Sequence, residues 1–285
     1  MPLFIDQLNR TIELNFAPRK IISVVPSQTE LLFDLGLNEE VIGITKFCVH
    51  PQQWFKTKTR MGGTKNLHLD EIRKLQPHLI IANKEENVKE QIETLAKDFP
   101  VWISDVNNLH DALEMMTAIG EITGKQNEAE ILIKQIKTSF ASLTNNQILK
   151  ENFYSKQPKT QNPKLKTAYL IWKDPYMTVG GDTFINDMLY YAGFENIFSQ
   201  LNRYPQITIE QLRSANTSVE TQCQLLILSS EPYPFKQKHI DELKDQLPDT
   251  KIILADGEMF SWYGSRLLKA PAYFKHLQIE ALSLF

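Results

Sequence analysis

Aromatic side chains gather in the loops that follow the predicted strands. They are Phe47, Tyr176, Tyr204, Phe260, Trp262 and Tyr263. A large apolar face with a polar tip suits a broad planar or macrocyclic ligand, and clefts lined by aromatic side chains are common small-molecule sites. Taken singly, each ring fits a place in the core at least as well, so the expectation depends on their shared location. The chemistry that this pattern favours is non-covalent capture of a ligand.

Basic side chains accompany these rings. His50 follows a predicted strand and is expected at its carboxyl end, where open α/β sheets bind ligands. The alternative for His50 is a loop histidine packed beside Trp54. Arg203 and Arg266 stand near two of the loop aromatics and could offer charge-assisted hydrogen bonds to carboxamide, carboxylate or phosphate groups. The alternative for both arginines is a solvated surface charge.

The motifs of catalysis, nucleotide binding and metal binding are missing. The glycine pairs at 62–63 and 180–181 stand alone, without the spacing of a phosphate-binding loop. They favour turns that need a positive φ, with the shaping of a cleft mouth as the alternative. No two histidines are spaced i,i+4, no C-x-x-C exists, and G-x-S-x-G is absent. We therefore expect no catalytic residue, no metal site and no cofactor.

Size and charge set further limits. With 285 residues, 42% of them hydrophobic, the chain can bury a large core, and the usual domain size of about 100–200 residues favours two lobes. Acidic residues number 34 and basic residues 31, so no positive field exists to attract nucleic acid. The two cysteines, Cys48 and Cys223, exclude a disulfide framework but leave a single bridge open; we expect both to fill apolar space.

Targeting and membrane signals are not visible. The segment 1–6 lacks a basic stretch followed by a long apolar run, so no secretory signal is recognised. No stretch reaches the roughly 18 consecutive apolar residues of a membrane-spanning helix. The sequence therefore predicts a soluble chain, either trimmed of an export signal or working in the cytoplasm.

Strands alternate with helices in the first part of the chain. A strand at 21–25 precedes Ser27-Gln28-Thr29-Glu30, which reads as a capping box opening a helix that ends at Gly36. Further strands are predicted at 41–44, 79–82 and 101–103, and helices at 69–75 and 88–97. This alternation favours a parallel sheet with both faces covered.

The middle of the chain is helical, and the alternation then resumes. Apolar spacing predicts helix from Leu109, a break near Gly124, and a helix from Gln126 to about Leu143 that could act as a stiff strut. Later strands are predicted at 168–172, 225–228 and 252–254, and helices at 184–192, 207–213, 236–247 and 267–284. The fold class is thus α/β, with two lobes of mainly parallel sheet joined by one long helix: an N-terminal lobe at 1–124, a linking helix at 125–155 and a C-terminal lobe at 156–285.

Several ordered segments together resemble the helical-backbone class of periplasmic binding proteins, the cobalamin and iron-siderophore receptors of ABC importers. The segments are Ile21 to Glu30 with Leu35-Gly36, then Leu75 to Ala82, Gly193 to Phe198, and Tyr204-Pro205-Gln206-Ile207 leading into Glu210. Each is weak alone, but their order and spacing cover nearly the whole chain. The cobalamin-binding members are the most similar.

The resemblance implies a monomeric, non-enzymatic binding protein acting in the periplasm. It implies a ligand held between two lobes, cobalamin or another corrinoid first and a ferric siderophore or haem next. It also implies that one carboxylate per lobe, by position Asp70 and Glu210, docks onto the membrane permease subunits of the importer. The alternative for each is an acid favoured in the first turn of a helix by the helix dipole.

Two departures from the family keep another function open. No export signal is visible, and the ligand-facing tryptophan that the family has before the Asp70 helix is replaced by Met61-Gly62-Gly63-Thr64-Lys65. The alternative is a cytoplasmic protein that handles corrinoids or metal, or a two-lobed transferase enzyme using the same cleft. The carboxylates Glu85 and Glu86 near a strand end motivate the enzyme version.

Overall fold

The computed structural model describes residues 2–144, 164–214 and 223–285. The chain divides into two compact units. Unit 1 holds residues 1–135 together with 262–267, and unit 2 holds residues 136–261 together with 268–285. A short segment near the carboxyl terminus therefore belongs to the first unit, although most of its sequence neighbours belong to the second.

Unit 1 is built on a parallel five-stranded sheet in the order β5-β4-β3-β8-β9. Its strands are β3 (Ile21–Ser23), β4 (Val41–Ile44), β5 (Thr59–Arg60), β8 (Leu79–Asn83) and β9 (Val101–Ser104). Every residue of β3, β8 and β9 is buried, as expected for a parallel sheet covered on both faces.

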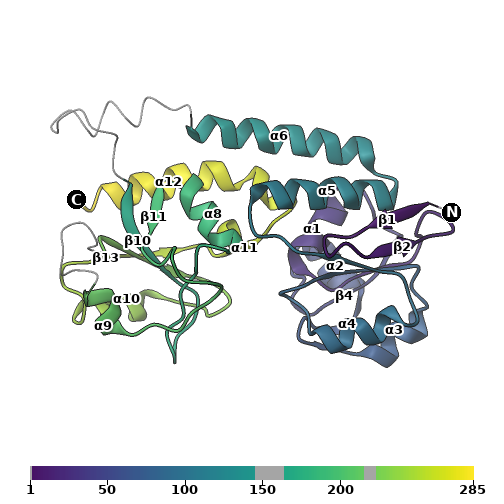
Figure 1. Ribbon diagram of the computed structural model, residues 1–285, viewed down its shortest axis with the longest axis horizontal. Coiled ribbons are helices and arrows are strands. Elements are labelled where there is room, and N and C mark those ends of the chain that lie inside the picture. Colours follow the sequence, from purple (N-terminus) through teal and green to yellow (C-terminus); the bar gives the residue numbers. More distant parts are fainter. Residues whose placement is uncertain (1, 145–163, 215–222) are drawn as a thin grey trace. The chain divides into compact units, whose positions relative to one another are not determined.

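Helices flank this sheet on both sides. They are α1 (Pro26–Asp34), α2 (Gln52–Thr57), α3 (Leu69–Leu75), α4 (Lys89–Ala96) and α5 (Leu109–Thr123). Ile72 of α3 and Leu95 of α4 pack into one apolar cluster with Ile22 and Ile80 of the sheet. Figure 1 shows α3 and α4 on the opposite side of this sheet from α5. The predicted strands and helices of this part are confirmed in type and order.

Two small hairpins of unit 1 were not predicted. They are β1 (Leu3–Ile5) with β2 (Thr11–Glu13), and β6 (Gly62–Gly63) with β7 (Asn66–Leu67). Gly62 has a φ of +87°, and an added Cβ would lie 2.3 Å from the Asn66 carbonyl oxygen. Glycine is therefore required in this turn, as the sequence predicted.

The predicted capping box at the start of α1 is wrong. The helix begins at Pro26, its N-cap is Val25, and no side chain caps it. Proline is well suited to the first helical position because its missing N–H would have no partner there. The Glu30 carboxylate, which the capping box needs, instead binds Arg266 through two hydrogen bonds.

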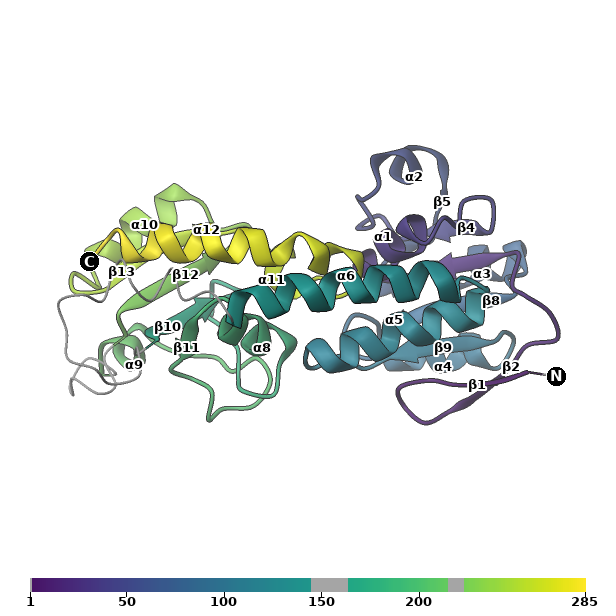
Figure 2. The same cartoon turned by 90° about the horizontal axis from the view of Figure 1, so that it is seen from above.

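The long helix predicted from Gln126 is present. Helix α5 ends at Gly124, which has a φ of +72°, and α6 runs over Gln126–Thr144. Within unit 1 the first part of α6 packs against α5, because a Cβ added at Gly120 would lie 2.6 Å from the Cβ of Ala129 (Figure 1 and Figure 2). The division between the units falls within α6, between residues 135 and 136. The rest of the predicted linker, 145–155, lies outside the described residues, and the predicted lobe boundaries stay a prediction.

Unit 2 is built on a parallel four-stranded sheet in the order β11-β10-β12-β13. Its strands are β10 (Leu165–Leu170), β11 (Phe194–Asn196), β12 (Leu225–Ser229) and β13 (Lys251–Ala255), and its helices are α8 (Phe184–Tyr191), α9 (Ile209–Ser214), α10 (Gln237–Lys244), α11 (Glu258–Ser261) and α12 (Ala270–Leu282). Leu212 of α9 and Leu243 of α10 pack with Leu226 and Leu228 on one face of the sheet. The two units thus confirm the predicted α/β class with parallel sheets.

Two elements of unit 2 begin elsewhere than predicted. The strand predicted at 168–172 lies at Leu165–Leu170, and the last helix begins at Ala270, after a 3-10 turn over Ser265–Leu268. Pro271 stands in the first turn of α12, where proline is tolerated, whereas it would interrupt a helix that started at residue 267.

Both cysteines are buried, Cys48 in unit 1 and Cys223 in unit 2, and no disulfide joins them. Cys223 packs in the apolar cluster of unit 2, as predicted for an apolar filler, whereas Cys48 lies against the hydroxyls of Thr29 and Thr45. Within residues 2–144, 164–214 and 223–285, the structure contains no helix with the length and apolar character needed to cross a membrane.

Candidate ligand-binding edges and docking carboxylates

The carboxyl edge of the unit 1 sheet rests on a buried polar network. Strands β3, β8 and β9 end in Ser23, Asn83 and Ser104, and Thr45 follows β4; all four side chains are buried. Asn83 Nδ2 donates to Ser104 Oγ over 2.9 Å, and the Thr29 hydroxyl of α1 donates to Ser23 Oγ over 2.8 Å. The first bond joins two neighbouring strands and the second joins α1 to β3, so the edge that carries the loops is held in one arrangement.

Cys48 belongs to the same network. The Thr29 hydroxyl lies 3.1 Å from its Sγ and the Thr45 hydroxyl 3.2 Å away. Burial raises the pKa of the Cys48 thiol. A thiol is a nucleophile only as its thiolate, so this environment favours an inert, structural cysteine.

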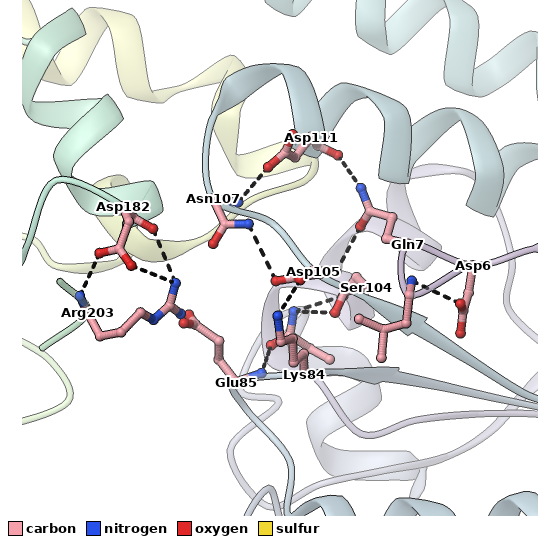
Figure 3. Close-up of polar contacts among 12 residues, drawn as sticks. Asp6, Gln7, Lys84, Glu85, Ser104, Asp105, Asn107, Asp111, Asp182 and Arg203 are labelled. Atoms are coloured by element: carbon pink, nitrogen blue, oxygen red, sulfur yellow. Dashed lines mark hydrogen bonds and ion pairs between the residues drawn. The ribbon is translucent and has the colours of Figure 1, made fainter. Parts of the chain in front are cut away.

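The loop after β9 is also fixed. Gln7 accepts a hydrogen bond from the Asp105 N–H over 3.0 Å and donates to the Asp111 carbonyl over 2.9 Å, and Lys84 pairs with Asp105 over 2.6 Å (Figure 3). The Asp111 carboxylate accepts from the N–H of Asn107 over 2.9 Å. The segment before β2 thus braces a loop that lies about a hundred positions away in sequence.

The loop after β4 presents two of the predicted ligand residues. Phe47 is 52% exposed, and the Lys46 ammonium lies 5.1 Å from the centre of its ring. An added Cβ on Gly63 would stand 3.1 Å from the Phe47 ring, so glycine at that position gives the ring room. His50 is half-exposed. An exposed phenylalanine on a fixed edge is a ready apolar contact for a ligand.

The structure brings His50 to Trp262. The His50 and Trp262 ring centres are 5.5 Å apart at 74°, an edge-to-face contact. Trp54 packs against Phe33, with ring centres 5.3 Å apart. Two predicted ligand residues that lie far apart in sequence therefore share one place in unit 1.

Segment 262–267 is tied to α1 by a buried ion pair. Arg266 donates from Nε and Nη2 to the two carboxylate oxygens of Glu30, each over 2.8 Å. The same guanidinium lies 4.7 Å from the centre of the Trp262 ring. Gly264, with a φ of +126°, passes so close to the helix that an added Cβ would lie 3.3 Å from the Ser27 carbonyl oxygen. The ion pair and this close passage hold Trp262 in position.

Arg266 is therefore not the exposed group that the sequence suggested. Its side chain is 7% exposed and engaged by Glu30, which differs from both a solvated charge and a guanidinium that faces a ligand. The reason is tertiary, since a buried arginine needs a buried carboxylate and Glu30 lies 236 positions away. Neighbouring Tyr263 is buried as well, at 6% exposure.

Arg203 is held on the edge loops of unit 2. Its backbone N–H donates to the Asp182 carboxylate, and its Nη1 donates to the Asp182 carbonyl over 3.2 Å (Figure 3). Arg203 has a φ of 56°, and its guanidinium lies 5.6 Å from the ring of the adjacent Tyr204. Both side chains are half-buried, so a predicted pair of ligand residues is positioned by one aspartate.

The loop that carries Arg203 packs closely against Gly180 and Gly181. An added Cβ at Gly180 would lie 2.3 Å from the Leu201 carbonyl oxygen, and one at Gly181 would lie 2.1 Å from that of Ser199. Neither glycine has a positive φ, so the predicted reason for this pair is wrong. Glycine is needed there because two backbone segments approach closely.

An aromatic pair at the carboxyl edge of the unit 2 sheet was missed. Trp172 follows β10 and Tyr233 follows β12; their ring centres are 5.7 Å apart at 70°, and Trp172 is 39% exposed. Tyr176, which was predicted, is half-buried nearby in sequence and packs against the same apolar cluster as Tyr233. The sequence placed Trp172 inside a strand, where an exposed contact is not expected. The position of Trp172 as the last residue of the predicted strand could have indicated that its side chain lies at the carboxyl edge of the sheet.

Phe260 does not share this exposed edge. It is fully buried and packs against Tyr169, with ring centres 5.2 Å apart, and against Phe274, 4.8 Å apart. Its position is that of a core residue, which corrects the ligand contact predicted for it. Helix α11 turns its ring toward α12 rather than outward, a direction that loop position alone does not reveal.

A hollow of about 420 Å³ lies in another part of unit 1, along residues 10–13 and 96–101. None of the predicted ligand residues lines it. In the part of the chain that the structure describes, no group of three His, Cys, Asp or Glu side chains is arranged to hold a metal ion.

Comparison with known proteins decides the family. The family model described as periplasmic binding protein matches residues 21–246, well over half of the chain. This chain belongs to the periplasmic binding protein family. The matched range includes all five strands of the unit 1 sheet, three of the four strands of the unit 2 sheet, and both predicted docking helices, α3 and α9.

Relatives of this periplasmic binding protein carry names of the same kind. An uncharacterised ABC transporter substrate-binding lipoprotein, YvrC of Bacillus subtilis, is 26% identical over 218 residues, which cover 74% of this chain and 65% of that protein. A vitamin B12-binding protein of Vibrio campbellii is 27% identical over 200 residues, 70% of this chain and 68% of the relative. The chain thus spans just under two thirds of the first of these relatives.

Solved structures share the fold at low identity. The periplasmic vitamin B12-binding protein BtuF of Vibrio cholerae superposes with a TM-score of 0.73 at 17% identity, covering 93% of this chain and 98% of that one. A periplasmic haem-binding protein of Pseudomonas aeruginosa gives 0.75 at 16% identity, covering 91% and 92%. Because one fold serves different ligands, this likeness describes the architecture and leaves the ligand to the site.

The two predicted docking carboxylates of this periplasmic binding protein are exposed. Asp70, in the first turn of α3, has a side chain that is 89% exposed and accepts a hydrogen bond from Arg73 over 3.2 Å. Glu210 stands in the first turn of α9, and hydrogen bonds from its own backbone N–H and from the Thr208 hydroxyl lower the pKa of its carboxyl. Both positions offer a negative charge to solvent.

Asp70 and Glu210 have similar surroundings. Arg73, three residues after Asp70, donates to Asp98 over 3.0 Å, just beyond α4. Arg213, three residues after Glu210, donates to the Gln246 carbonyl over 2.8 Å, just beyond α10. In each unit an arginine therefore fixes the helix that carries the exposed acid against the chain that leaves the next helix.

Proposed function

We propose that this protein is the substrate-binding protein of an ABC-type importer and that it captures a large ligand, a corrinoid such as cobalamin before a ferric siderophore or haem. The family match over residues 21–246 carries the proposal. Relatives named vitamin B12-binding protein support the first ligand class. A haem-binding protein of the same fold is the reason for retaining haem among the proposed ligands.

The ligand contacts we propose lie on the carboxyl edges of the two sheets. In unit 1 they are Phe47 and His50, which packs against the buried ring of Trp262; in unit 2 they are the Trp172–Tyr233 pair with Tyr176, Tyr204 and Arg203. Phe47 and Trp172, 52% and 39% exposed, supply apolar area, and the arginine, half-buried and held by Asp182, supplies directed hydrogen bonds. Arg266 and Phe260 take supporting positions beneath these groups.

Binding without catalysis is the activity that these groups support. The Cys48 thiol is buried with a raised pKa, and the edge residues are mainly aromatic. We therefore propose a protein that delivers its ligand unchanged. Its place of action would be outside the cytoplasmic membrane, as a monomer.

The partners we propose are the membrane permease subunits of the importer. Asp70 and Glu210 would dock onto basic residues of these subunits, one from each unit. Exposed carboxylates set the rate and orientation of association more than its affinity. Loss of either charge would therefore impair delivery without changing ligand capture.

Titration calorimetry with cyanocobalamin tests the proposal. We expect saturable 1:1 binding to the wild-type protein, weakened about tenfold by Phe47→Ala and by Trp172→Ala, since one aromatic contact contributes about 1–1.5 kcal/mol. Phe16→Ala is the matched control, because Phe16 is equally exposed, at 55%, and precedes β3 rather than following a strand of the sheet. Binding of haemin or a ferric siderophore in place of cyanocobalamin would change the ligand class; no binding of any of them would contradict the proposal.

A further inference from the structure

Glu86 is a carboxylate at the proposed ligand edge of unit 1 that the function above does not use. It follows β8, three residues after Asn83 of the buried polar network, in the loop that leads to α4. The Asn83 side-chain oxygen accepts hydrogen bonds from the backbone N–H groups of Glu85 and Glu86, over 2.8 and 2.9 Å. Asn87 then donates to the Val24 carbonyl over 3.2 Å. The backbone that carries Glu86 is therefore fixed.

The Glu86 side chain lacks the partners that other sheltered carboxylates of this unit have. It is half-buried, and its carboxylate makes no hydrogen bond or ion pair with residues 2–144, 164–214 or 223–285. Asp6, by comparison, is bound by Arg10 over 2.7 Å, and Glu30 is bound twice by Arg266. A sheltered carboxylate without a donor is costly, so its retention needs a reason.

The charges around Glu86 do not supply that donor. Lys65 attracts it electrostatically, but the Lys65 ammonium donates to the Glu85 carbonyl instead. The Glu86 charge also contributes, as the smallest cause, to the raised pKa of the Cys48 thiol. Burial raises the pKa of the Glu86 carboxyl, as expected when water is removed and little replaces it.

We propose that Glu86 contacts the bound ligand and selects for hydrogen-bond donors on it, so that the protein prefers a ligand edged with carboxamides to one edged with carboxylates. An amide N–H would give the carboxylate the partner that it lacks in the free protein. A ligand carboxylate at the same place would meet a like charge in a sheltered site, a repulsion that rejects the wrong ligand. The inference rests on the proposed function and narrows its ligand class, because corrinoids carry peripheral carboxamides and haem carries two carboxylates.

The experiment compares cyanocobalamin with its monocarboxylates, in which one peripheral carboxamide is hydrolysed to a carboxylate. Binding of each separated isomer is measured by tryptophan fluorescence at mildly alkaline pH, with the wild-type protein, Glu86→Gln and Glu86→Ala. Glu90→Gln, a change of the same charge at an exposed position of α4, is the matched control. Thermal unfolding of each variant checks that it is folded.

We expect the wild-type protein to bind cyanocobalamin at least tenfold more tightly than one of the monocarboxylate isomers, and Glu86→Gln to remove that preference. Glu86→Ala should weaken cyanocobalamin binding about tenfold to a hundredfold, the range for a hydrogen bond to a charged group. Glu90→Gln should leave all affinities unchanged.

Three results would overturn the inference, and they separate it from the proposed function. Cyanocobalamin binding with an unchanged preference in Glu86→Gln would remove the role of Glu86 and leave the receptor function standing. Tight binding of haemin to the wild-type protein, with no gain in affinity in Glu86→Gln, would also remove the role of Glu86. The receptor function would then stand with haem as its ligand class. Failure of the wild-type protein to bind cyanocobalamin, haemin or a ferric siderophore would remove the proposed function, and the inference with it.

Discussion

Glu30 and Arg266 are 236 positions apart in sequence and form two hydrogen bonds of 2.8 Å to each other inside unit 1. This ion pair brings a segment from near the carboxyl terminus onto the first long helix of the chain. It also places Trp262 against His50, which makes it a determinant of the proposed ligand edge.

Removing Arg266 should destabilise the protein strongly. Arg266→Leu leaves the Glu30 carboxylate buried without its partner, and such a loss costs about 3–5 kcal/mol. The free energy of unfolding, measured by urea denaturation, should fall by that amount. The double variant Glu30→Gln/Arg266→Leu should recover part of the loss, and Arg73→Leu, in an exposed pair, should cost under about 1 kcal/mol. Equal losses in the two arginine variants would contradict the assignment of a buried pair.

Glu86→Gln should stabilise the ligand-free protein at neutral pH and not at acidic pH. Folding raises the pKa of the Glu86 carboxyl above its ordinary value of 4.5, so the unfolded chain releases this proton first. The carboxyl therefore costs stability that appears as pH rises through 4.5 toward the raised pKa, and glutamine avoids that cost. Thermal unfolding across this pH range measures it. A pH-independent difference between the two proteins would show that Glu86 is not the cause.

Gly181→Ala should be more harmful than Gly124→Ala. The added methyl at Gly181 would stand 2.1 Å from the Ser199 carbonyl oxygen, whereas at Gly124 nothing lies within 4 Å and only the φ of +72° opposes it. Strain of the latter kind costs about 1 kcal/mol. Chemical denaturation ranks the two variants, and Gly181→Ala should also weaken ligand binding because the Arg203 loop packs on this glycine pair.

Neither cysteine should react in the native protein. Burial raises the pKa of the Cys48 thiol, and it raises that of Cys223 to about 12, so both stay protonated at neutral pH. A thiol-specific chromogenic reagent should label no sulfur until the protein unfolds, and two afterwards. Rapid labelling of the native protein would contradict the buried positions.

Reversal of the docking charges should separate delivery from capture. Asp70→Lys and Glu210→Lys change exposed side chains, so ligand affinity should stay within about twofold of the wild-type value. Transport by the reconstituted importer should fall for each variant and further for both together. Glu71→Lys, next to Asp70 on α3, is the matched control. Unchanged transport in both Asp70→Lys and Glu210→Lys would contradict the docking assignment.

Local patterns of the sequence were sufficient for the elements. The apolar run at 79–82 and the apolar spacing from Gln126 predicted β8 and α6, because burial in a sheet or along a helix leaves a pattern of apolar residues that short stretches display. The alternation of strands and helices gave the α/β class for the same reason. The exposed positions of Asp70 and Glu210 also follow from local position, since both stand in the first turn of a helix.

Only the tertiary structure decided which loop residues meet. The sequence predicted loop positions for Arg266 and Phe260 as for Phe47, yet Arg266 lies in a 3-10 turn and Phe260 in α11, and both are buried. Their partners, Glu30 and Phe274, could not be identified from any local sequence pattern. Trp172 was hidden by its place at the end of a strand. The assignment of residues 262–267 to unit 1 depends on contacts across more than two hundred positions, and such contacts are set by how the whole chain packs rather than by the period of any segment.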